Sequence, residues 1–238
     1  MQTVAVVLAA GSGSRFGAAE PKQLQVLAGR SLIEHCVLAF DNAPAIDQVL
    51  VVTSAAIAAR ARAELAGYGK VRDVIRGGAS RTDSTREAIR WLQSGRAGPD
   101  CKVLFHDAAR PLVSQKIIAE CVLGLDRWQA LGVVVPSADT VVEMTAGQIL
   151  RVLPRETLGR CQTPQAFLLS VISRAYEAAD ADPGFASSQP TDDCGVVLRY
   201  LPGVPVGAVR GSERNLKVTY PADLAVASAL LDVPGQAG

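Results

Sequence analysis

The sequence TVAVVLAAGSGSRFG, residues 3–17, joins an apolar run to a glycine-rich loop, and EPKQ follows at residues 20–23. Six apolar or β-branched residues in succession are typical of a strand buried on both faces, as in a parallel sheet. The glycines let backbone N–H groups approach an anion closely, and Arg15 and Lys22 add positive charge. We therefore expect a buried strand that ends in a phosphate-binding loop.

Two familiar phosphate loops do not fit this stretch. The dinucleotide fingerprint needs a third glycine so that its helix can pack on the strand, and Phe16 occupies that position. A Walker loop ends in Gly-Lys-Ser/Thr, whereas Lys22 follows a proline that would interrupt a helix. Two interpretations remain: a phosphate loop of a third geometry, or a surface turn whose cations are simply solvated.

The length and composition of the chain narrow the class of protein. Its 238 residues, 49% of them hydrophobic, predict one domain with a substantial core over residues 1–238. The 24 Lys and Arg nearly balance 23 Asp and Glu, which argues against nucleic acid or a membrane as a partner. The five cysteines are scattered and odd in number, which argues against a disulfide framework. We therefore expect the protein in the reducing cytoplasm. The start of the chain lacks the pattern of an export signal, so we expect a soluble protein.

Short β-branched runs alternate with helical patterns as far as residue 135. We expect strands at residues 3–8, 48–53, 71–75, 102–106 and 132–135, and helices near residues 31–40, 55–66, 82–93 and 115–129. This alternation indicates βαβ units, and so an α/β fold with a mostly parallel twisted sheet and helices on both faces. Because ligands bind at the carboxyl ends of such strands, we expect the residues there to converge on one crevice.

The alternation stops after Pro136. Residues 140–143 and 149–153 flank a glycine-containing turn, which predicts a β-hairpin arm inserted at about residues 138–162. An isolated hairpin is barely stable in water, so we expect it to pack on a second subunit, with its own domain as the alternative. Beyond it we expect a helix near residues 168–179, a helix capped by Thr191, strands at 206–209 and 216–219, and a helix from Pro221.

His106 and Asp107 end one of the expected strands, shortly before Arg110. An aspartate beside a phosphate loop suits Mg²⁺, which binds one or two carboxylates together with phosphate oxygens. Its alternative role is to cap the turn before the next helix. His106 is better interpreted as a packed, hydrogen-bonded residue than as a base, because a phosphate nucleophile needs none.

Two further segments bring polar groups to expected strand ends. Gly77, Gly78 and Ser84 precede or open a helix, where they could hold a base, a ribose or a phosphate, or form an ordinary helix cap. Lys217 lies in an otherwise apolar run. A charge at such a position favours an anionic partner, and an exposed edge strand is the alternative.

Eight short motifs occur in order along nearly the whole chain. They are Ala9-Ala10-Gly11-Ser12-Gly13-Ser14-Arg15, Pro21-Lys22-Gln23, Gly77-Gly78 with Arg81 and Ser84, His106-Asp107-Ala108-Ala109-Arg110-Pro111, Asp139-Thr140, Thr163-Pro164-Gln165, Thr191-Asp192-Asp193 and Lys217-Val218-Thr219. Together they closely resemble the 2-C-methyl-D-erythritol 4-phosphate cytidylyltransferases of the non-mevalonate isoprenoid pathway. The resemblance implies a Rossmann-like nucleotidyltransferase fold. It also implies that methylerythritol phosphate attacks the α-phosphorus of CTP and expels pyrophosphate, with Mg²⁺ or another divalent cation as cofactor.

The same resemblance implies the roles of individual residues. The expected catalytic residues are Arg15, Lys22 and Lys217, of which the first two stabilise the transition state and the third neutralises phosphate. The expected nucleotide-binding residues are Ala9, Ala10, Gly11, Gly13, Gly77, Gly78, Ser84, Asp107 and Ala108. The expected acceptor-binding residues are Asp107, Arg110, Thr140, Arg155 and Thr163, and Asp107 is also the expected metal ligand.

The resemblance further implies a homodimer in which Thr140 and Arg155 of the arm hold the acceptor in the neighbouring active site. Three alternatives compete with this function. One is a cytidylyltransferase for another polyol phosphate, such as ribitol 5-phosphate. Another is a regulator that binds the nucleotide without turning it over. The third, a dinucleotide-dependent oxidoreductase, conflicts with Phe16.

Overall fold

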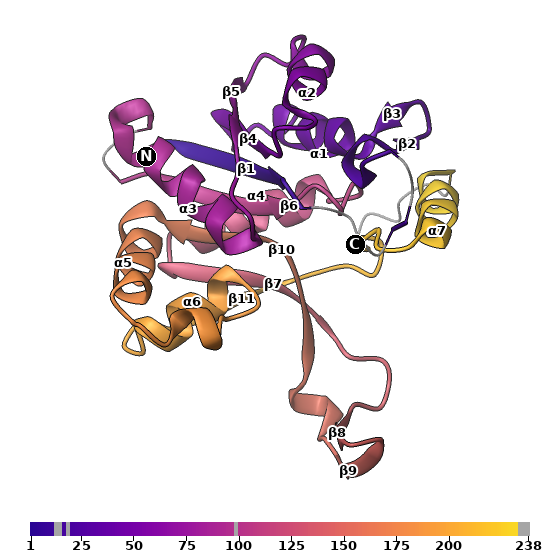
Figure 1. Cartoon of the computed structure of the whole chain (residues 1–238), viewed down its shortest axis with the longest axis vertical. Helices are drawn as coiled ribbons and strands as arrows, with labels where there is room; N and C mark the ends of the chain where they lie inside the picture. Colours follow the sequence, from indigo (N-terminus) through magenta and orange to yellow (C-terminus); the bar gives the residue numbers. More distant parts are fainter. Residues whose placement is uncertain (12–15, 18–19, 98–99, 233–238) are drawn as a thin grey trace.

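Within the described residues, seven strands form one mixed sheet in the order β11-β7-β10-β6-β1-β4-β5 (Figure 1). The structure, a computed structural model, describes residues 1–11, 16–17, 20–97 and 100–232. The strands are β1 (Thr3–Ala9), β4 (Gln48–Thr53), β5 (Val71–Arg76), β6 (Lys102–Asp107), β7 (Ala130–Pro136), β10 (Gly159–Leu168) and β11 (Val206–Arg210). Among these described strands, only β10 runs antiparallel to its neighbours. The expected α/β fold is therefore confirmed.

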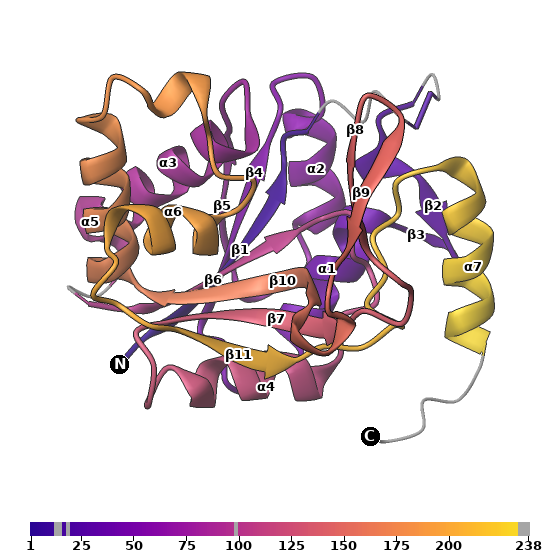
Figure 2. The same ribbon diagram turned by 90° about the horizontal axis from the view of Figure 1, so that it is seen from below.

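Helices cover both faces of the sheet, and two apolar cores lie between the layers. One core contains residues of α1 (Leu32–Asp41), α2 (Ala58–Leu65) and α4 (Gln115–Gly124). The other contains residues of α3 (Arg81–Trp91), α5 (Leu169–Asp180) and α6 (Asp193–Tyr200). Figure 2 shows α4 and α6 on opposite sides of β7 and β10.

β1 explains how one apolar run serves both cores. Val4 and Val6 point into one core, whereas Ala5 and Val7 point into the other. Successive side chains of a strand point to opposite faces, so a strand at the centre of a covered sheet needs apolar residues at every position. The sequence 3–8 meets that requirement, and β1 therefore occupies a central place between β4 and β6.

A third, smaller apolar cluster lies beyond the carboxyl end of β1. It joins Phe16, Leu27, Leu32, Val218 and Ala227. Ala227 belongs to α7 (Pro221–Asp232), which lies beside a short hairpin of β2 (Val26–Leu27) and β3 (Arg30–Ser31), as Figure 1 shows. Single turns of 3-10 helix lie at Lys22–Leu24, Arg155–Thr157 and Phe185–Ser187, and a π-helical turn extends α3 over Leu92–Arg96.

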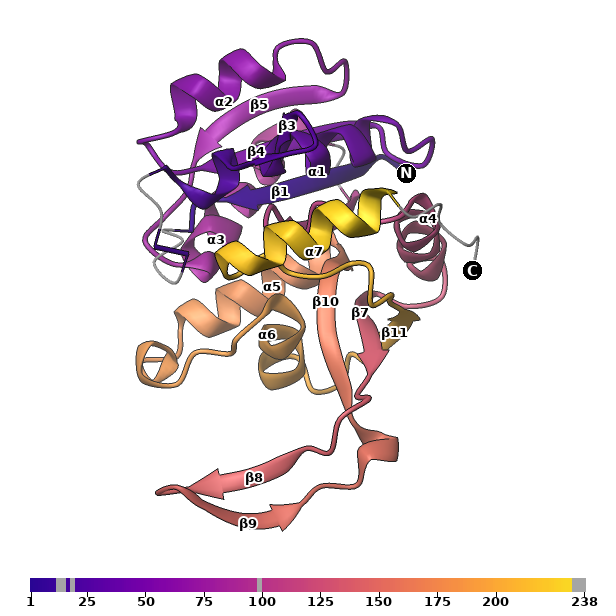
Figure 3. The same cartoon turned by 90° about the vertical axis from the view of Figure 1, so that its right-hand side faces the viewer.

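The expected hairpin is present as β8 (Val142–Thr145) and β9 (Gln148–Val152). Figures 1 and 3 show that it projects away from the sheet, between the end of β7 and the start of β10. Four large apolar side chains of the hairpin are each more than half exposed: Met144, Ile149, Leu150 and Val152. Within the described part of the chain, no helix is both long and apolar enough to cross a membrane.

The structure corrects three expectations about the second half of the chain. The sequence pattern does not predict β10, which already pairs with β7 at Gly159, so residues 159–162 belong to the main sheet instead of the arm. The expected strand at 216–219 is wrong: this segment has no regular secondary structure and belongs to none of the described sheets. The N-cap of α6 is Asp192 and not Thr191. The Asp192 side chain accepts a hydrogen bond from the Gly195 N–H.

Candidate active site

A crevice of about 290 Å³ opens where β1 and β6 end. Its walls come from five remote segments of the chain. The residues that line the crevice include Ala10, Gly11, Phe16, Lys22, Gln23, Arg81, Ser84, Asp107, Ala108, Ala109, Lys217 and Thr219. Parallel strands place their carboxyl ends at one edge of the sheet, and this edge gathers the side chains, as the sequence predicts.

The other expected site residues that the structure describes lie outside this lining. Ala9 is buried in β1, Gly77 lies against Ser84, Gly78 lies against Asp83, and Arg110 and Thr163 are buried near Asp107. Thr140 and Arg155 lie on the exposed arm and not on the crevice. Gly13 and Arg15 lie outside the described residues.

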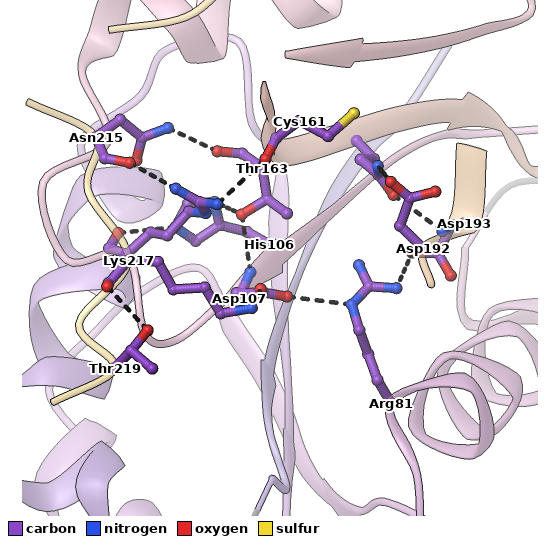
Figure 4. A network of polar contacts seen from close by, with 12 residues as sticks. Arg81, His106, Asp107, Cys161, Thr163, Asp192, Asp193, Asn215, Lys217 and Thr219 are labelled. Carbon is purple, nitrogen blue, oxygen red and sulfur yellow. Dashed lines mark hydrogen bonds and ion pairs between the residues drawn. The ribbon is translucent and has the colours of Figure 1, made fainter. Parts of the chain in front are cut away.

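Asp107 lies at the end of β6 between two cations (Figure 4). Lys217 Nζ is 2.7 Å from Oδ2 of Asp107, and Arg81 Nε is 3.2 Å from Oδ1. Burial acts to raise the pKa of this carboxyl, but the charges of Arg81 and Lys217 outweigh it and hold the pKa well below its usual range. Asp107 is therefore a carboxylate at neutral pH, and Lys217 is held in the crevice.

Arg81 and Asp193 extend this set of ion pairs, and sequence reasoning assigned neither a site role of its own. Arg81 Nη1 donates to Asp193 Oδ2 at 2.8 Å, and the Tyr176 hydroxyl donates to Oδ1 at 2.7 Å. Asp193 is fully buried. Asp193 occupies the first turn of a helix, where acidic residues are common, so the sequence offers no signal that it pairs with Arg81.

His106 is buried behind Asp107 and makes two hydrogen bonds. The Thr163 hydroxyl accepts from the Asp107 N–H at 3.1 Å, so its own proton is free to point at His106 Nδ1, also 3.1 Å away. Nε2 then carries the ring proton and donates to the Arg110 carbonyl at 3.0 Å. Burial lowers the pKa of His106 to about 4, so the ring is neutral near pH 7. This is the packed, hydrogen-bonded role that the sequence predicts.

Arg110 and Asn215 fix the segment that carries Lys217. Arg110 Nη1 donates to the Asn215 carbonyl at 2.7 Å, and Asn215 Nδ2 donates to the Thr163 carbonyl at 2.9 Å. The Val218 N–H donates to the Ala109 carbonyl at 2.8 Å. These bonds hold the segment without a sheet ladder, which explains how Lys217 reaches the crevice although residues 216–219 form no strand.

Lys22 enters the crevice on the turn Lys22–Leu24. The next residue, Gln23, is buried, and its side-chain amide donates to the carbonyl of Gly11. This bond ties the start of the glycine-rich loop to the turn that carries Lys22. The position of Lys22 is thus set by the same loop that the sequence predicts to bind phosphate.

Gly77 allows β1, β4 and α3 to approach closely beside the crevice. A Cβ there would lie 2.6 Å from Ser84 Oγ and 2.7 Å from the Ala10 Cβ. We predict that Gly77→Ala destabilises the fold by about 1–3 kcal/mol through overpacking. Thermal unfolding measures this loss of stability. Gly67→Ala is the control, because its added Cβ meets nothing within 4 Å; equal losses in the two variants would contradict the prediction.

The carboxylates available to a divalent cation are few. Among the described residues, no group of three or more His, Cys, Asp or Glu side chains could hold a metal ion. Glu213, the nearest carboxylate in sequence to Lys217, is paired with Arg160. Mg²⁺ keeps several waters and is often bound by one carboxylate plus substrate phosphates, so Asp107 alone fits an ion held mainly by the nucleotide.

An α/β sheet with a cationic crevice at its carboxyl edge, next to a glycine-rich loop, is typical of a nucleotidyltransferase. The family model described as IspD, 2-C-methyl-D-erythritol 4-phosphate cytidylyltransferase, matches residues 3–233. The chain therefore belongs to this family and is a cytidylyltransferase. The family generally uses a divalent cation.

Individual relatives agree with this family. The 2-C-methyl-D-erythritol 4-phosphate cytidylyltransferase of Thermobifida fusca is 49% identical over 237 residues, covering 97% of this chain and 93% of that protein. The crystal structure of the Thermus thermophilus enzyme of the same name has a TM-score of 0.75 and 30% identity, covering 96% of this chain and 98% of that one. The Haemophilus influenzae bifunctional ribulose 5-phosphate reductase/CDP-ribitol pyrophosphorylase Bcs1 is 36% identical over 96% of this chain, which spans about half of that protein (48%).

Proposed function

We propose that this chain transfers the cytidylyl group of CTP to 2-C-methyl-D-erythritol 4-phosphate and releases pyrophosphate, a step of the non-mevalonate route to isoprenoid precursors. The observation that supports it most is the convergence of Lys22, Asp107 and Lys217, from three remote segments, on one crevice in a chain of this family. Its five free cysteines suit the cytoplasm as the place of the reaction.

In this proposal the reaction is an in-line attack of one anion on another. The two phosphates repel each other, so the site must supply positive charge where negative charge develops on the α-phosphoryl oxygens. Lys22 and Arg15 would supply it to the triphosphate, and Lys217 would neutralise phosphate charge that develops during the reaction. A bound Mg²⁺ would add Lewis-acid stabilisation of the phosphate oxygens. The attacking phosphate is already anionic, so no base is needed, in agreement with a neutral His106.

We place the nucleotide against the end of β1 and the start of α3. Ala10 and Gly11, with Gly13 of the loop, would lie along the phosphates, and Ala9 would support them from the end of β1. Ala108 would line the wall beside Asp107. Gly77, Gly78 and Ser84 would lie against the base and ribose. Ser84 donates its own proton to the Ser80 carbonyl at 2.9 Å, which leaves its lone pairs for a ligand donor.

We place the acceptor on the other side of Asp107, near Thr163 and Arg110. The remaining acceptor contacts would come from Thr140 and Arg155 of a second subunit, because the arm of each chain projects away from its own sheet (Figure 3). The exposed apolar side chains of the arm, such as Ile149 and Val152, support its packing on a second copy of the chain. The protein would then act as a homodimer.

The test is a matrix of nucleotides and acceptors followed by pyrophosphate release. We expect CTP with methylerythritol phosphate and Mg²⁺ to give the highest kcat/KM, and removal of the divalent cation by EDTA to abolish turnover. A strong preference for UTP, GTP or ATP would contradict the proposal. Nucleotide binding without turnover of any acceptor would favour a regulator instead.

One observation favours a second candidate acceptor. The Haemophilus influenzae relative is named a CDP-ribitol pyrophosphorylase, so ribitol 5-phosphate belongs in the matrix. Competition between the two acceptors at a fixed CTP concentration separates the candidates. We expect methylerythritol phosphate to be used in preference, and a higher kcat/KM for ribitol 5-phosphate would reassign the acceptor.

A further inference from the structure

Arg81 is shared between two carboxylates, and only one of them faces the crevice. Its Nε binds Asp107, a crevice residue, whereas Nη1 binds Asp193, which is fully buried and not part of the lining (Figure 4). The remaining nitrogen, Nη2, is buried without a hydrogen-bond partner. The direction of the guanidinium therefore depends on these two ion pairs.

Asp193 is held rigidly from its other side. Its Oδ1 accepts from the Tyr176 hydroxyl of α5 at 2.7 Å, and its N–H donates to Gln165 Oε1 of β10 at 3.0 Å. The first bond fixes the carboxylate, and the second fixes the backbone that carries it. A rigid buried carboxylate can orient Arg81 precisely enough for one nitrogen to reach Asp107, much as outer-shell partners orient metal ligands.

The charges along this row of residues alternate. Lys217, Asp107, Arg81 and Asp193 carry positive, negative, positive and negative charge in turn. Without Asp193, the whole charge of Arg81 would act on Asp107, and the crevice would gain one net positive charge. A divalent cation would then be repelled, and Asp107 would exchange Lys217 for that cation less readily.

On the basis of the proposed function, we infer that Asp193 is a positioning residue that aims Arg81 at Asp107 and offsets its charge, and so allows Asp107 to take part in binding a divalent cation together with the nucleotide. Asp193 touches neither substrate nor metal in this inference. Asp193, in α6, acts on Asp107 at the end of β6 through its ion pair with Arg81 of α3.

The test compares Asp193→Asn with the unaltered protein in two assays. Binding of Mn²⁺ in the presence of saturating CTP, without acceptor, is followed by the electron paramagnetic resonance signal of free Mn²⁺. We expect the Kd for Mn²⁺ to rise about 10-fold. In steady-state turnover, the Mg²⁺ concentration for half-maximal rate should rise by a similar factor, and kcat at saturating Mg²⁺ should largely recover.

Asp182→Asn is the matched control. Asp182 also accepts from a tyrosine hydroxyl, that of Tyr200 at 2.6 Å, and from an arginine, Arg199 Nη2 at 2.9 Å, but it does not line the crevice. The Asp182→Asn variant should leave the Kd for Mn²⁺ unchanged even if it lowers the melting temperature. An equal shift in this control, or a folded Asp193→Asn that binds Mn²⁺ like the unaltered protein, would overturn the inference.

If Asp193→Asn does not fold, Tyr176→Phe tests the role of Asp193 instead. The Tyr176→Phe variant keeps both carboxylates and removes only one hydrogen bond to Asp193. We expect its Kd for Mn²⁺ to rise about threefold, and no rise would count against the inference. The Mn²⁺ assay needs no acceptor. Failure of the proposed function, seen as no turnover by the unaltered protein, is therefore distinguishable from failure of this inference.

Discussion

Lys217→Ala is expected to lower kcat for pyrophosphate release by about 100- to 1,000-fold, the usual cost of removing one preorganised charge from a transition state. Lys217 Nζ lies 2.7 Å from Asp107, so its ammonium is already placed in the crevice before any ligand binds. Its charge is therefore present where phosphate charge develops, which is why its loss should reduce turnover more than affinity for CTP. Steady-state kinetics with both substrates measure this difference.

The same variant removes one of the two cations beside Asp107, so its fold must be checked by thermal unfolding. Lys217→Arg keeps the charge but changes its geometry, and we expect intermediate turnover. Lys116→Ala, at an exposed position of α4, is the matched control and should retain full activity. Turnover of Lys217→Ala within threefold of the unaltered protein would show that this lysine does not stabilise the transition state.

The sequence predicted most of the first half of the fold because local patterns determine it. The apolar run at residues 3–8 had to be buried on both faces, and the repeated strand and helix patterns placed β1, β4, β5 and β6 in one parallel sheet. The position of Lys22 and Asp107 in one crevice follows from that topology, since Asp107 ends β6 and Lys22 comes after the carboxyl end of β1.

β10 was missed because its sequence argues against a strand. Pro164 has no N–H to donate, and proline inside a run normally excludes a central strand. Here the pairing between β10 and β7 is interrupted between Gln162 and Gln165, which accommodates the proline. The error at residues 216–219 is the opposite one, because the sequence predicts a strand that the structure lacks. The apolar residues of this segment pack on the cluster around Phe16 and Leu32 and not in a sheet.

The pairing of Arg81 with Asp193 could not be predicted from local sequence at all. The two residues are 112 positions apart, and each lies at the start of a different helix. Only the packing of α3 and α6 on the same face of the sheet brings them together. Long-range ion pairs of this kind leave no periodic signal, unlike strands and amphipathic helices.

The variants Lys217→Ala and Arg155→Ala are each expected to be nearly inactive alone, and to regain activity when one subunit of a dimer carries the first substitution and its partner carries the second. In the proposed homodimer, each active site uses Lys217 of its own subunit and Arg155 of the partner subunit. Arg155 lies exposed on the arm, where its guanidinium donates only to the Ala138 carbonyl at 3.3 Å among the described contacts. Its charge is therefore available to an acceptor phosphate, and Arg155→Ala should lose most turnover with that acceptor.

In a heterodimer of Lys217→Ala with Arg155→Ala, one site collects both substitutions and the other collects neither. Half of the dimers formed by random pairing are heterodimers, so about a quarter of the sites should be intact and turnover should recover to about that fraction. Co-expression with two different tags yields the heterodimer for assay. The control pairs Lys217→Ala with Lys22→Ala, which line the same crevice of one chain and should give no recovery. If purified heterodimers of the first pair stay inactive, Arg155 does not act across the dimer, because only a contribution from the partner subunit can restore one complete site.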